Sequence, residues 1–289
     1  MATCVARQYD ALARMAAWSA RLQGPLRIDR LCMHKRLLPP PAGLEGERPG
    51  AGQSAINDFL AERIVRDQPA TVLDLGCGFG ATLAALAERH QARYVGVGNA
   101  SFPLRIGRGL LPKTQGGRDV SLQLADLNAP QALGRFDAIL ALESLAYADC
   151  LATAAANTVA AMNPGAVLWL IDDWLGSSAH RDDHDARAVC ASWGRKELYD
   201  WPSCRHAFLQ QGVELIEDLD LTDQVPARQR PPGRLRRALL ARTVALVPVA
   251  TFRSLLHAFV GGWHLERLYA RGLAHYRLAA FRKMDSDGH

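Results

Sequence analysis

The sequence predicts a doubly wound α/β fold with a mostly parallel sheet of seven strands. Two observations support this prediction. First, short apolar runs alternate with helical patterns through residues 71–171, as strands do when helices cover both faces of a parallel sheet. Second, a glycine-rich turn joins the first apolar run to the helical pattern behind it. Open parallel sheets bind their ligands at such turns.

Each element is assigned from its own apolar pattern and from the turn signals that bound it. Short runs rich in Val, Ile, Leu and aromatic residues predict strands. These runs cover 71–75, 93–97, 121–125, 136–142, 166–171, 213–219 and 273–283. Apolar residues that recur at steps of three and four predict helices. These patterns cover 54–66, 81–90, 102–109, 152–162 and 204–211.

The chain before this core has a different pattern. Residues 1–38 are expected to be helical, because apolar residues such as Tyr9 and Trp18 recur at helical spacing. Residues 39–52 are rich in proline and glycine and predict a loop. The chain is therefore divided into an N-terminal helical segment at 1–53, a ligand-binding core at 54–173, and a cap with the end of the sheet at 174–289.

The composition is that of an ordinary globular chain with a mild positive charge. Hydrophobic residues make up 49% of the chain, and the formal net charge of +5 is too small to indicate nucleic acid by itself. The six cysteines include no C-x-x-C pair, so neither a zinc ribbon nor a redox dithiol is indicated. Since no export signal is recognised at the start, a cytoplasmic protein is expected.

The most apolar stretch, residues 238–260, is interrupted by charged residues and a proline, so it does not predict a membrane-spanning helix. A cluster of arginines precedes it, at Arg228, Arg230, Arg234, Arg236 and Arg237. Two interpretations stay open: a solvated amphipathic cap, or contact of residues 234–260 with an anionic membrane surface. Nucleic-acid binding is not expected, because no aromatic stacking pattern accompanies the arginines.

The glycine-rich turn reads Asp74-Leu-Gly-Cys-Gly-Phe-Gly80. Glycines let the backbone approach a ligand closely, and the helix behind them supplies free N–H groups. A dinucleotide loop has the spacing G-x-G-x-x-G, whereas the third glycine here comes two residues after the second. Asp74 would repel a pyrophosphate but suits a cationic amino-acid group. The motif therefore favours a sulfonium nucleoside over NAD, with a plain structural turn as the remaining alternative.

This motif resembles the first motif of the class I S-adenosylmethionine-dependent methyltransferases, usually written D-x-G-x-G-x-G. The resemblance covers roughly residues 54–173 and is closest to the small-molecule group of sterol, tocopherol and cyclopropane-fatty-acid enzymes. It implies S-adenosyl-L-methionine as cofactor, S-adenosyl-L-homocysteine as product, and a lid formed by residues 1–53. The cofactor-binding residues implied by the motif are Asp74 near the methionine ammonium, and Gly76, Cys77, Gly78 and Gly80 under the methionine and ribose.

The next strands add further cofactor candidates by the same resemblance. Asn99 ends the second strand, where many relatives carry an acid that binds the ribose hydroxyls, and a plain turn is the alternative. Asp126 and Leu127 follow the third strand, where relatives contact the adenine. A helix N-cap is the alternative for Asp126. Leu142, the last residue of the fourth strand, is also assigned to the cofactor.

The fourth and fifth strands end in candidates for catalysis and acceptor binding. Glu143 would face the sulfonium, where a carboxylate can stabilise a cation or accept a proton. Asp173 is a second candidate acid, and Trp174 offers an aromatic wall for the acceptor. Tyr147 stands where several relatives place a histidine, and is assigned to acceptor binding with packing as the alternative.

Two residues of the lid resemble positions that recur in the same family. Tyr9 belongs to a Tyr-Asp pair and is assigned to acceptor binding, and His34 belongs to a Met-His pair. His34 is a candidate base because the ordinary pKa of histidine lies near neutrality. An isolated histidine in a helix is more often structural, which is the alternative.

His180 and His184 stand at a spacing that suits a metal ion if the segment is helical. A run as dense in charge as residues 180–185 is more often a solvated surface loop, and no metal is expected.

The sequence therefore predicts an S-adenosylmethionine-dependent methyltransferase for a small, largely hydrophobic acceptor such as a terpenoid or polyketide. Carbon, oxygen and nitrogen acceptors stay open, as do a monomer and a homodimer. An NAD-dependent oxidoreductase would need a G-x-G-x-x-G loop and an acid after the second strand, and the sequence has neither. A non-catalytic nucleoside-binding module is the other alternative, although the joint presence of Asp74, Asp126 and Glu143 argues against it.

Overall fold

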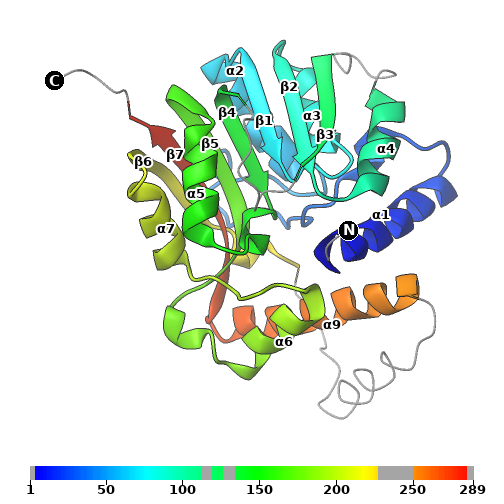
Figure 1. Cartoon of the computed structure of the whole chain (residues 1–289), viewed down its shortest axis with the longest axis vertical. Coiled ribbons are helices and arrows are strands. Elements are labelled where there is room, and N and C mark those ends of the chain that lie inside the picture. The colour runs from blue at the N-terminus through cyan, green and yellow to red at the C-terminus, as the bar shows by residue number, and fades with distance from the viewer. Residues whose placement is uncertain (1–3, 112–118, 126–133, 227–249, 285–289) are drawn as a thin grey trace.

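The computed structural model describes residues 4–111, 119–125, 134–226 and 250–284. Within these ranges seven strands form one sheet in the order β3-β2-β1-β4-β5-β7-β6 (Figure 1). The strands are β1 (Thr71–Leu75), β2 (Arg93–Gly98), β3 (Val120–Leu124), β4 (Phe136–Leu142), β5 (Met162–Leu175), β6 (Val213–Asp220) and β7 (Ala274–Lys283). Strands β1 to β5 are parallel, and β7 is antiparallel to its neighbours β5 and β6. The predicted doubly wound, mostly parallel sheet is confirmed.

Helices cover both faces of this sheet. The helices on one face are α2 (Ala55–Asp67), α3 (Ala81–Ala87) and α4 (Ser101–Leu110), and those on the other are α5 (Leu151–Ala160) and α7 (Trp201–Leu209). Successive residues of a strand point to opposite faces, so Val72 and Leu73 belong to two separate hydrophobic cores. Because the central strands are buried on both sides, their sequences are continuous apolar runs.

Three further helices lie together beyond the carboxyl ends of the parallel strands: α1 (Cys4–Leu22), α6 (His184–Trp193) and α9 (Ala250–Ala270) (Figure 1). Helix α9 contacts both α1 and α6. An apolar cluster that includes Val189, Leu265 and Leu268 joins α6 to α9. The N-terminal and C-terminal parts of the chain thus form one covering layer, while the segment boundaries near residues 53 and 173 stay predictions. Short 3₁₀ turns complete the fold at η1 (Ile28–Leu31), η4 (Leu145–Tyr147), η5 (Ser178–His180) and η6 (Thr222–Gln224).

Residues 23–27 and 32–38 are not helical, and residues 28–31 form only the 3₁₀ turn η1, contrary to the expectation of helix for the whole of 1–38. Leu37 exchanges two backbone hydrogen bonds with Gly52, with N···O distances of 3.1 and 2.9 Å. The N–H of Leu38 donates to the carbonyl of Gln224 at 2.7 Å. These long-range bonds, together with the prolines that follow at 39–41, override the local helical pattern.

Strand β5 extends to Leu175, beyond the predicted end at residue 171. The extension exists because β7 pairs with β5 in register from Val167 to Leu175. It carries Asp173 to the carboxyl edge of the sheet, directly opposite Tyr276.

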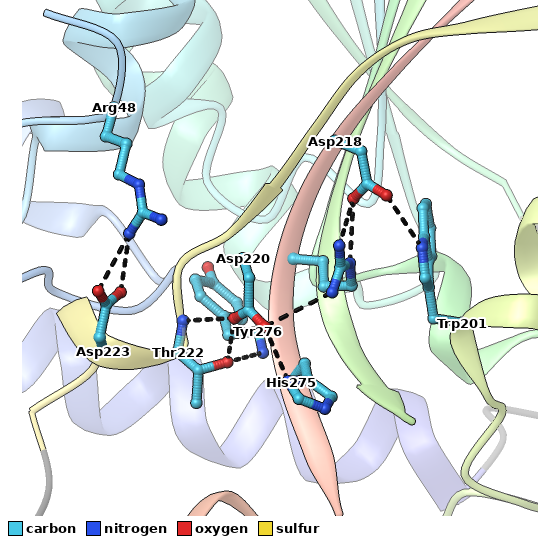
Figure 2. A network of polar contacts seen from close by, with 9 residues as sticks. Arg48, Trp201, Asp218, Asp220, Thr222, Asp223, His275 and Tyr276 are labelled. Carbon is cyan, nitrogen blue, oxygen red and sulfur yellow. Dashed lines mark hydrogen bonds and ion pairs between the residues drawn. The ribbon is translucent and has the colours of Figure 1, made fainter. Parts of the chain in front are cut away.

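Figure 2 shows the polar contacts that fix the start of β7 at this edge. The hydroxyl of Thr222 accepts the backbone N–H of Tyr276 at 2.9 Å, and Asp220 accepts the backbone N–H of Thr222 at 3.0 Å. Arg48, from the loop at 39–52, donates to Asp223 at 2.9 Å. The loop and η6 are thereby tied together, and the backbone of Tyr276 is held in place beside β5.

Among the helices in the described ranges, none has the length and hydropathy needed to cross a membrane. Residues 234–249 of the segment considered for membrane-surface contact lie outside those ranges.

Helix α4 passes so close to the glycine-rich turn that Gly107 has no room for a side chain. A Cβ at Gly107 would collide with the backbone carbonyl of Phe79. We expect Gly107→Ala to lower the free energy of unfolding by about 1–3 kcal/mol, as overpacking does. Gly109, in the same helix, has nothing within 4 Å of an added Cβ. Gly109→Ala is therefore the matched control and should stabilise the protein by up to about 1 kcal/mol. Equal effects of the two substitutions in urea unfolding would contradict this packing.

Candidate active site

A cavity of about 270 Å³ lies where the carboxyl ends of β1, β2, β4 and β5 meet the covering helices. Eleven of the residues predicted for the site line it: Tyr9, His34, Asp74, Gly76, Cys77, Gly78, Asn99, Leu142, Glu143, Tyr147 and Asp173. Gly80 and Trp174 do not line it. Asp126 and Leu127 lie outside the described residues. The structure therefore brings together residues from four strand ends and the N-terminal segment.

The glycine-rich turn presents bare backbone to the cavity. Gly76 and Gly78 have positive φ values of 93° and 52°, which glycine adopts without strain. The N–H groups of Gly76 and Cys77 donate to the carbonyl of Val97 at 2.8 and 3.0 Å, which ties the turn to β2. A Cβ at Gly76 would collide with Ser144, so the turn after β1 also packs directly on the turn after β4.

Asp74, the penultimate residue of β1, lies in the wall of this cavity and is 2% exposed. No described residue donates a hydrogen bond to its carboxylate. Burial raises the pKa of Asp74 to about 7. A buried carboxylate without a partner is costly, so this site favours a ligand that brings a positive charge or hydrogen-bond donors.

Glu143 follows β4 in a backbone conformation that is rare for a residue with a side chain. Its φ is +51°, and its N–H donates to the carbonyl of Ile171 at 2.7 Å. One carboxylate oxygen, Oε1, accepts the backbone N–H of Lys35 and the hydroxyl of Tyr276, each at 2.8 Å. Strained backbone of this kind persists where the surroundings hold it, and it concentrates at functional sites. Two distant parts of the chain thus fix this carboxylate at the cavity wall, and β5 holds the backbone behind it.

Lys35 joins Glu143 to Asp173. Its Nζ lies 2.9 Å from Asp173 and 3.6 Å from Glu143, and 4.4 Å from the centre of the Tyr276 ring. Burial opposes the charged form of Lys35, but the two carboxylates outweigh it, so the pKa of Lys35 is raised. The hydroxyl of Tyr269 donates to the other oxygen of Asp173. Burial also holds the pKa values of both tyrosines well above their ordinary range, so both stay neutral donors.

The sequence prediction missed Lys35, Tyr269 and Tyr276. Lys35 had one signal, since it is one of only four lysines in the chain. Tyr276 and Tyr269 had none, because the antiparallel insertion of β7 beside β5 brings Tyr276 to the site and Tyr269 reaches it from the end of α9. That pairing cannot be deduced from the spacing of the residues along the chain.

Two aromatic residues stand beside Glu143. The ring of Tyr9 packs edge-on against the ring of Tyr147, with centroids 5.5 Å apart. The hydroxyl of Tyr9 points to the carbonyl oxygen of Glu143 at 3.5 Å. Both rings line the cavity, as their predicted role in acceptor binding requires. The role itself stays a prediction.

The prediction for Trp174 does not fit the structure. Its side chain is fully buried in the core on the other face of the sheet, against Trp201. The reason is strand alternation: Asp173 faces the cavity, so the next residue points away. Trp193 of α6 is the tryptophan that lines the cavity.

His34 lines the cavity, but both of its ring nitrogens have protein partners. Nε2 lies 3.0 Å from the side-chain oxygen of Asn57, and Nδ1 lies 3.4 Å from the carbonyl of Lys35. It lies in the irregular segment after η1, and not in a helix as expected. Its role as a base stays a prediction, and these contacts favour the structural alternative.

The charged run at residues 180–185 is solvated as expected at Asp182 and His184, but not at Asp185. His184 begins α6, and Asp185 is 1% exposed. His184, Asp185 and His264 place possible metal-ligand atoms within 4.8 Å of one another, whereas His180 is not part of this group. Asp185 also pairs with Arg267 at 3.0 Å and with Arg271 at 3.2 Å. These two positive charges oppose a metal ion and make Asp185 the centre of an ion-pair network between α6 and α9.

Comparison with known proteins shows what the central part of the chain is similar to. A family model described as a methyltransferase domain matches residues 73–168, from β1 to β5. The chain matches a methyltransferase domain over these residues. It is 38% identical over 115 residues to the trans-aconitate 2-methyltransferase of Azoarcus sp. (strain BH72), a match that covers 39% of this chain and 43% of that protein.

The chain has further relatives of known name. It is 24% identical over 171 residues to the O-methyltransferase rstn1 of Aspergillus nomiae NRRL, covering 57% of this chain and 73% of that protein. For four of the first five curated relatives the match covers less than two thirds of the relative's length.

A solved structure extends the fold comparison to nearly the whole chain. The geranyl diphosphate C-methyltransferase of Streptomyces coelicolor A3(2), in complex with Mg²⁺, geranyl diphosphate and S-adenosyl-L-homocysteine, superposes with a TM-score of 0.66. The identity is 14%, and the match covers 98% of this chain and 100% of that one. The predicted fold is thereby confirmed over nearly the whole chain. The family model and the curated relatives support the predicted enzyme class for the part of the chain that they match.

Proposed function

We propose that this protein transfers the methyl group of S-adenosyl-L-methionine to a small molecule bound in the cavity. The observation that supports the proposal most strongly is that two unusual carboxylates line the same cavity at the ends of the adjacent strands β1 and β4. Asp74 is buried without a partner beside the bare backbone of Gly76 and Gly78. Glu143 is held in a strained conformation beside Lys35. One carboxylate suits an ammonium group, and the other suits positive charge at the reacting centre.

The residues of the cavity fit S-adenosylmethionine. Asp74 would accept hydrogen bonds from the methionine ammonium, Gly76 and Gly78 would leave room for the methionine and ribose, and the exposed amide of Asn99 would reach the ribose. When bound, the cofactor supplies a methyl group on a positively charged sulfur. The chain's own part is to orient the acceptor, to exclude water and to hold negative charge at Glu143 near that sulfur.

Glu143 and Asp173 are the candidates for accepting a proton from the acceptor. Glu143 is 22% exposed at its side chain, whereas Asp173 is 2% exposed and is already held by Lys35 and Tyr269. Glu143 is therefore the better-placed base, and Asp173 keeps Lys35 in position. If the nucleophile of the acceptor has no proton to lose, Glu143 would contribute only its negative charge.

The acceptor is a small molecule in this proposal. The relatives named above are, by name, methyltransferases for trans-aconitate and geranyl diphosphate and an O-methyltransferase. The wall of the cavity that would contact the acceptor is aromatic and polar. Tyr9, Tyr147 and Trp193 form it together with charged side chains. A terpenoid or polyketide acceptor, and methylation at carbon, oxygen or nitrogen, are all consistent with that wall. The test is transfer of an isotopically labelled methyl group to metabolite pools; no labelled product from any pool would reject the proposed activity.

We also propose a cytoplasmic location and a monomer or homodimer. The five cysteines whose side chains are described, Cys32, Cys77, Cys150, Cys190 and Cys204, are free, which suits a reducing compartment.

Binding of S-adenosylhomocysteine should depend on the ionisation of Asp74. The pKa of Asp74 in the empty cavity is about 7, so the carboxylate is mostly protonated at pH 6 and mostly charged at pH 8. Since the ammonium group requires the charged form, affinity should be about tenfold weaker at pH 6 than at pH 8. Isothermal titration at both pH values measures this difference. Asp74→Asn should bind more weakly and lose the pH dependence; an unchanged pH dependence in this variant would assign it to another group.

A further inference from the structure

Arg195 is a buried cation in the wall of the cavity. It follows α6, its side chain is 1% exposed, and it lines the cavity together with Tyr147 and Trp193. Its guanidinium carbon lies 4.2 Å from the centre of the Tyr147 ring and 5.1 Å from that of Trp193. Stacking on two aromatic rings fixes the plane of the guanidinium but satisfies none of its hydrogen-bond donors.

The hydrogen bonds of this guanidinium are incomplete. Nε and Nη1 have no hydrogen-bond partner among the described residues. Nη2 has one, Oδ1 of Asp172, at the long distance of 3.4 Å. Asp172 is already held without Arg195, because it accepts the backbone N–H of Ala146 at 3.1 Å and that of Asp173 at 2.9 Å. A fully buried guanidinium with two unpaired nitrogens is costly to maintain, which indicates a ligand that completes it.

We propose that Arg195 recognises a carboxylate on the methyl acceptor, so that the acceptor class is a small organic acid. This inference rests on the proposed methyltransferase function and narrows its substrate. Nη2 carries a second N–H besides the one that reaches Asp172, and together with Nη1 it can give two parallel hydrogen bonds, the arrangement that matches a carboxylate. Lys35, the other described cation of the wall, is already shared by Asp173 and Glu143 and is not available for this role. The rings of Tyr147 and Trp193 would then lie against the body of the acid.

A carboxylate could also come from the methionine part of the cofactor, but the sheet places Arg195 far from that end. Asp74 is the expected partner of the methionine ammonium. In the sheet Asp74 pairs with Leu140 of β4, and Leu140 pairs with Trp169 of β5. Asp172 lies one strand beyond β4 and three residues further along β5 than Trp169. With strands about 4.8 Å apart and a rise of about 3.3 Å per residue, the two aspartates are separated by roughly 10 Å across the sheet and roughly 10 Å along it. Arg195 contacts Asp172, at the far side of this separation. The ammonium and carboxylate of one amino acid are bonded to the same carbon, so an ammonium at Asp74 favours a cofactor carboxylate near Asp74 and not at Arg195.

The test uses the full chain saturated with S-adenosylhomocysteine. The probes are cinnamic acid, 3-methylbutanoic acid and geranic acid, each paired with its methyl ester, and binding is measured by isothermal titration. We expect at least one acid to bind about tenfold to a hundredfold more tightly than its ester, as a charge-assisted bond predicts. Arg195→Gln should remove this preference, and Arg195→Lys should keep only part of it. The control is Arg187→Gln, which changes an exposed arginine of α6 outside the cavity wall.

The possible results distinguish a failure of the proposed function from a failure of the inference about Arg195. If the unmodified protein does not bind S-adenosylhomocysteine, the proposed function fails. If it binds S-adenosylhomocysteine but prefers no acid over its ester, or if Arg195→Gln keeps the preference, the inference about the acceptor is wrong and the proposed function stands. If Arg195→Gln weakens S-adenosylhomocysteine binding more than about tenfold while remaining folded by circular dichroism, Arg195 holds the cofactor's carboxylate and the inference is also wrong.

Discussion

Glu143→Gln is expected to lower the rate of methyl transfer by roughly a hundredfold or more, with little change in the affinity for S-adenosylhomocysteine. The carboxylate lies in the cavity wall, and its Oε1 is held by the N–H of Lys35 and the hydroxyl of Tyr276. Gln keeps the size of the side chain and can keep both hydrogen bonds through its carbonyl oxygen. It removes only the negative charge and the capacity to take a proton, so the loss should appear in turnover.

Single-turnover rates with labelled S-adenosylmethionine, and titration of the same preparations with S-adenosylhomocysteine, measure both quantities. Glu197→Gln is the matched control, because Glu197 pairs with Arg181 away from the cavity wall and should leave both values unchanged. Unchanged turnover in Glu143→Gln would contradict the assignment and move the catalytic role to Asp173 or His34.

Lys35→Met is expected to lower the free energy of unfolding by about 3–5 kcal/mol, the largest effect on stability that the site offers. Lys35 is the only described cation that pairs with Asp173 or Glu143. Met fills much of the same volume but leaves two largely buried carboxylates without compensation. Their mutual repulsion should also loosen the N-terminal segment that carries Lys35.

Urea unfolding monitored by circular dichroism measures this loss. Lys196→Met is the control, since the exposed Lys196 only donates to the carbonyl of Asp149 at 3.3 Å. Adding Asp173→Asn to Lys35→Met should recover part of the lost stability, because it removes one of the two carboxylates left without a positive partner. A double variant no more stable than Lys35→Met would show that the lysine acts through packing and not through charge.

The sequence was sufficient for the parts of the fold that depend on local patterns. Strands β1 and β4 were predicted with the ends that the structure gives them, because buried parallel strands are short apolar runs with clear turn signals. The turn from Asp74 to Gly80 was located for the same reason, and most of the residues predicted from the ends of β1, β2, β4 and β5 line one cavity.

The parts that failed depend on contacts between distant segments. Tyr276 reaches Glu143 only because β7 inserts antiparallel between β5 and β6. Lys35 reaches the site through an irregular segment whose backbone bonds run to residues far along the chain. The prediction for Trp174 failed because neighbouring side chains of a strand point to opposite faces of the sheet. Asp173, one position earlier, faces the cavity, and Trp174 faces away from it.

The most direct test of the central claim is the effect of S-adenosylhomocysteine on thermal unfolding. The arrangement of Asp74, Gly76 and Gly78 predicts saturable binding of one molecule per chain. At a ligand concentration about 100 times the dissociation constant, binding should stabilise the fold by about 2.7 kcal/mol, which appears as a higher melting temperature. NAD at the same concentration should have no effect. No shift with saturating S-adenosylhomocysteine, or a shift with NAD in its place, would contradict the account.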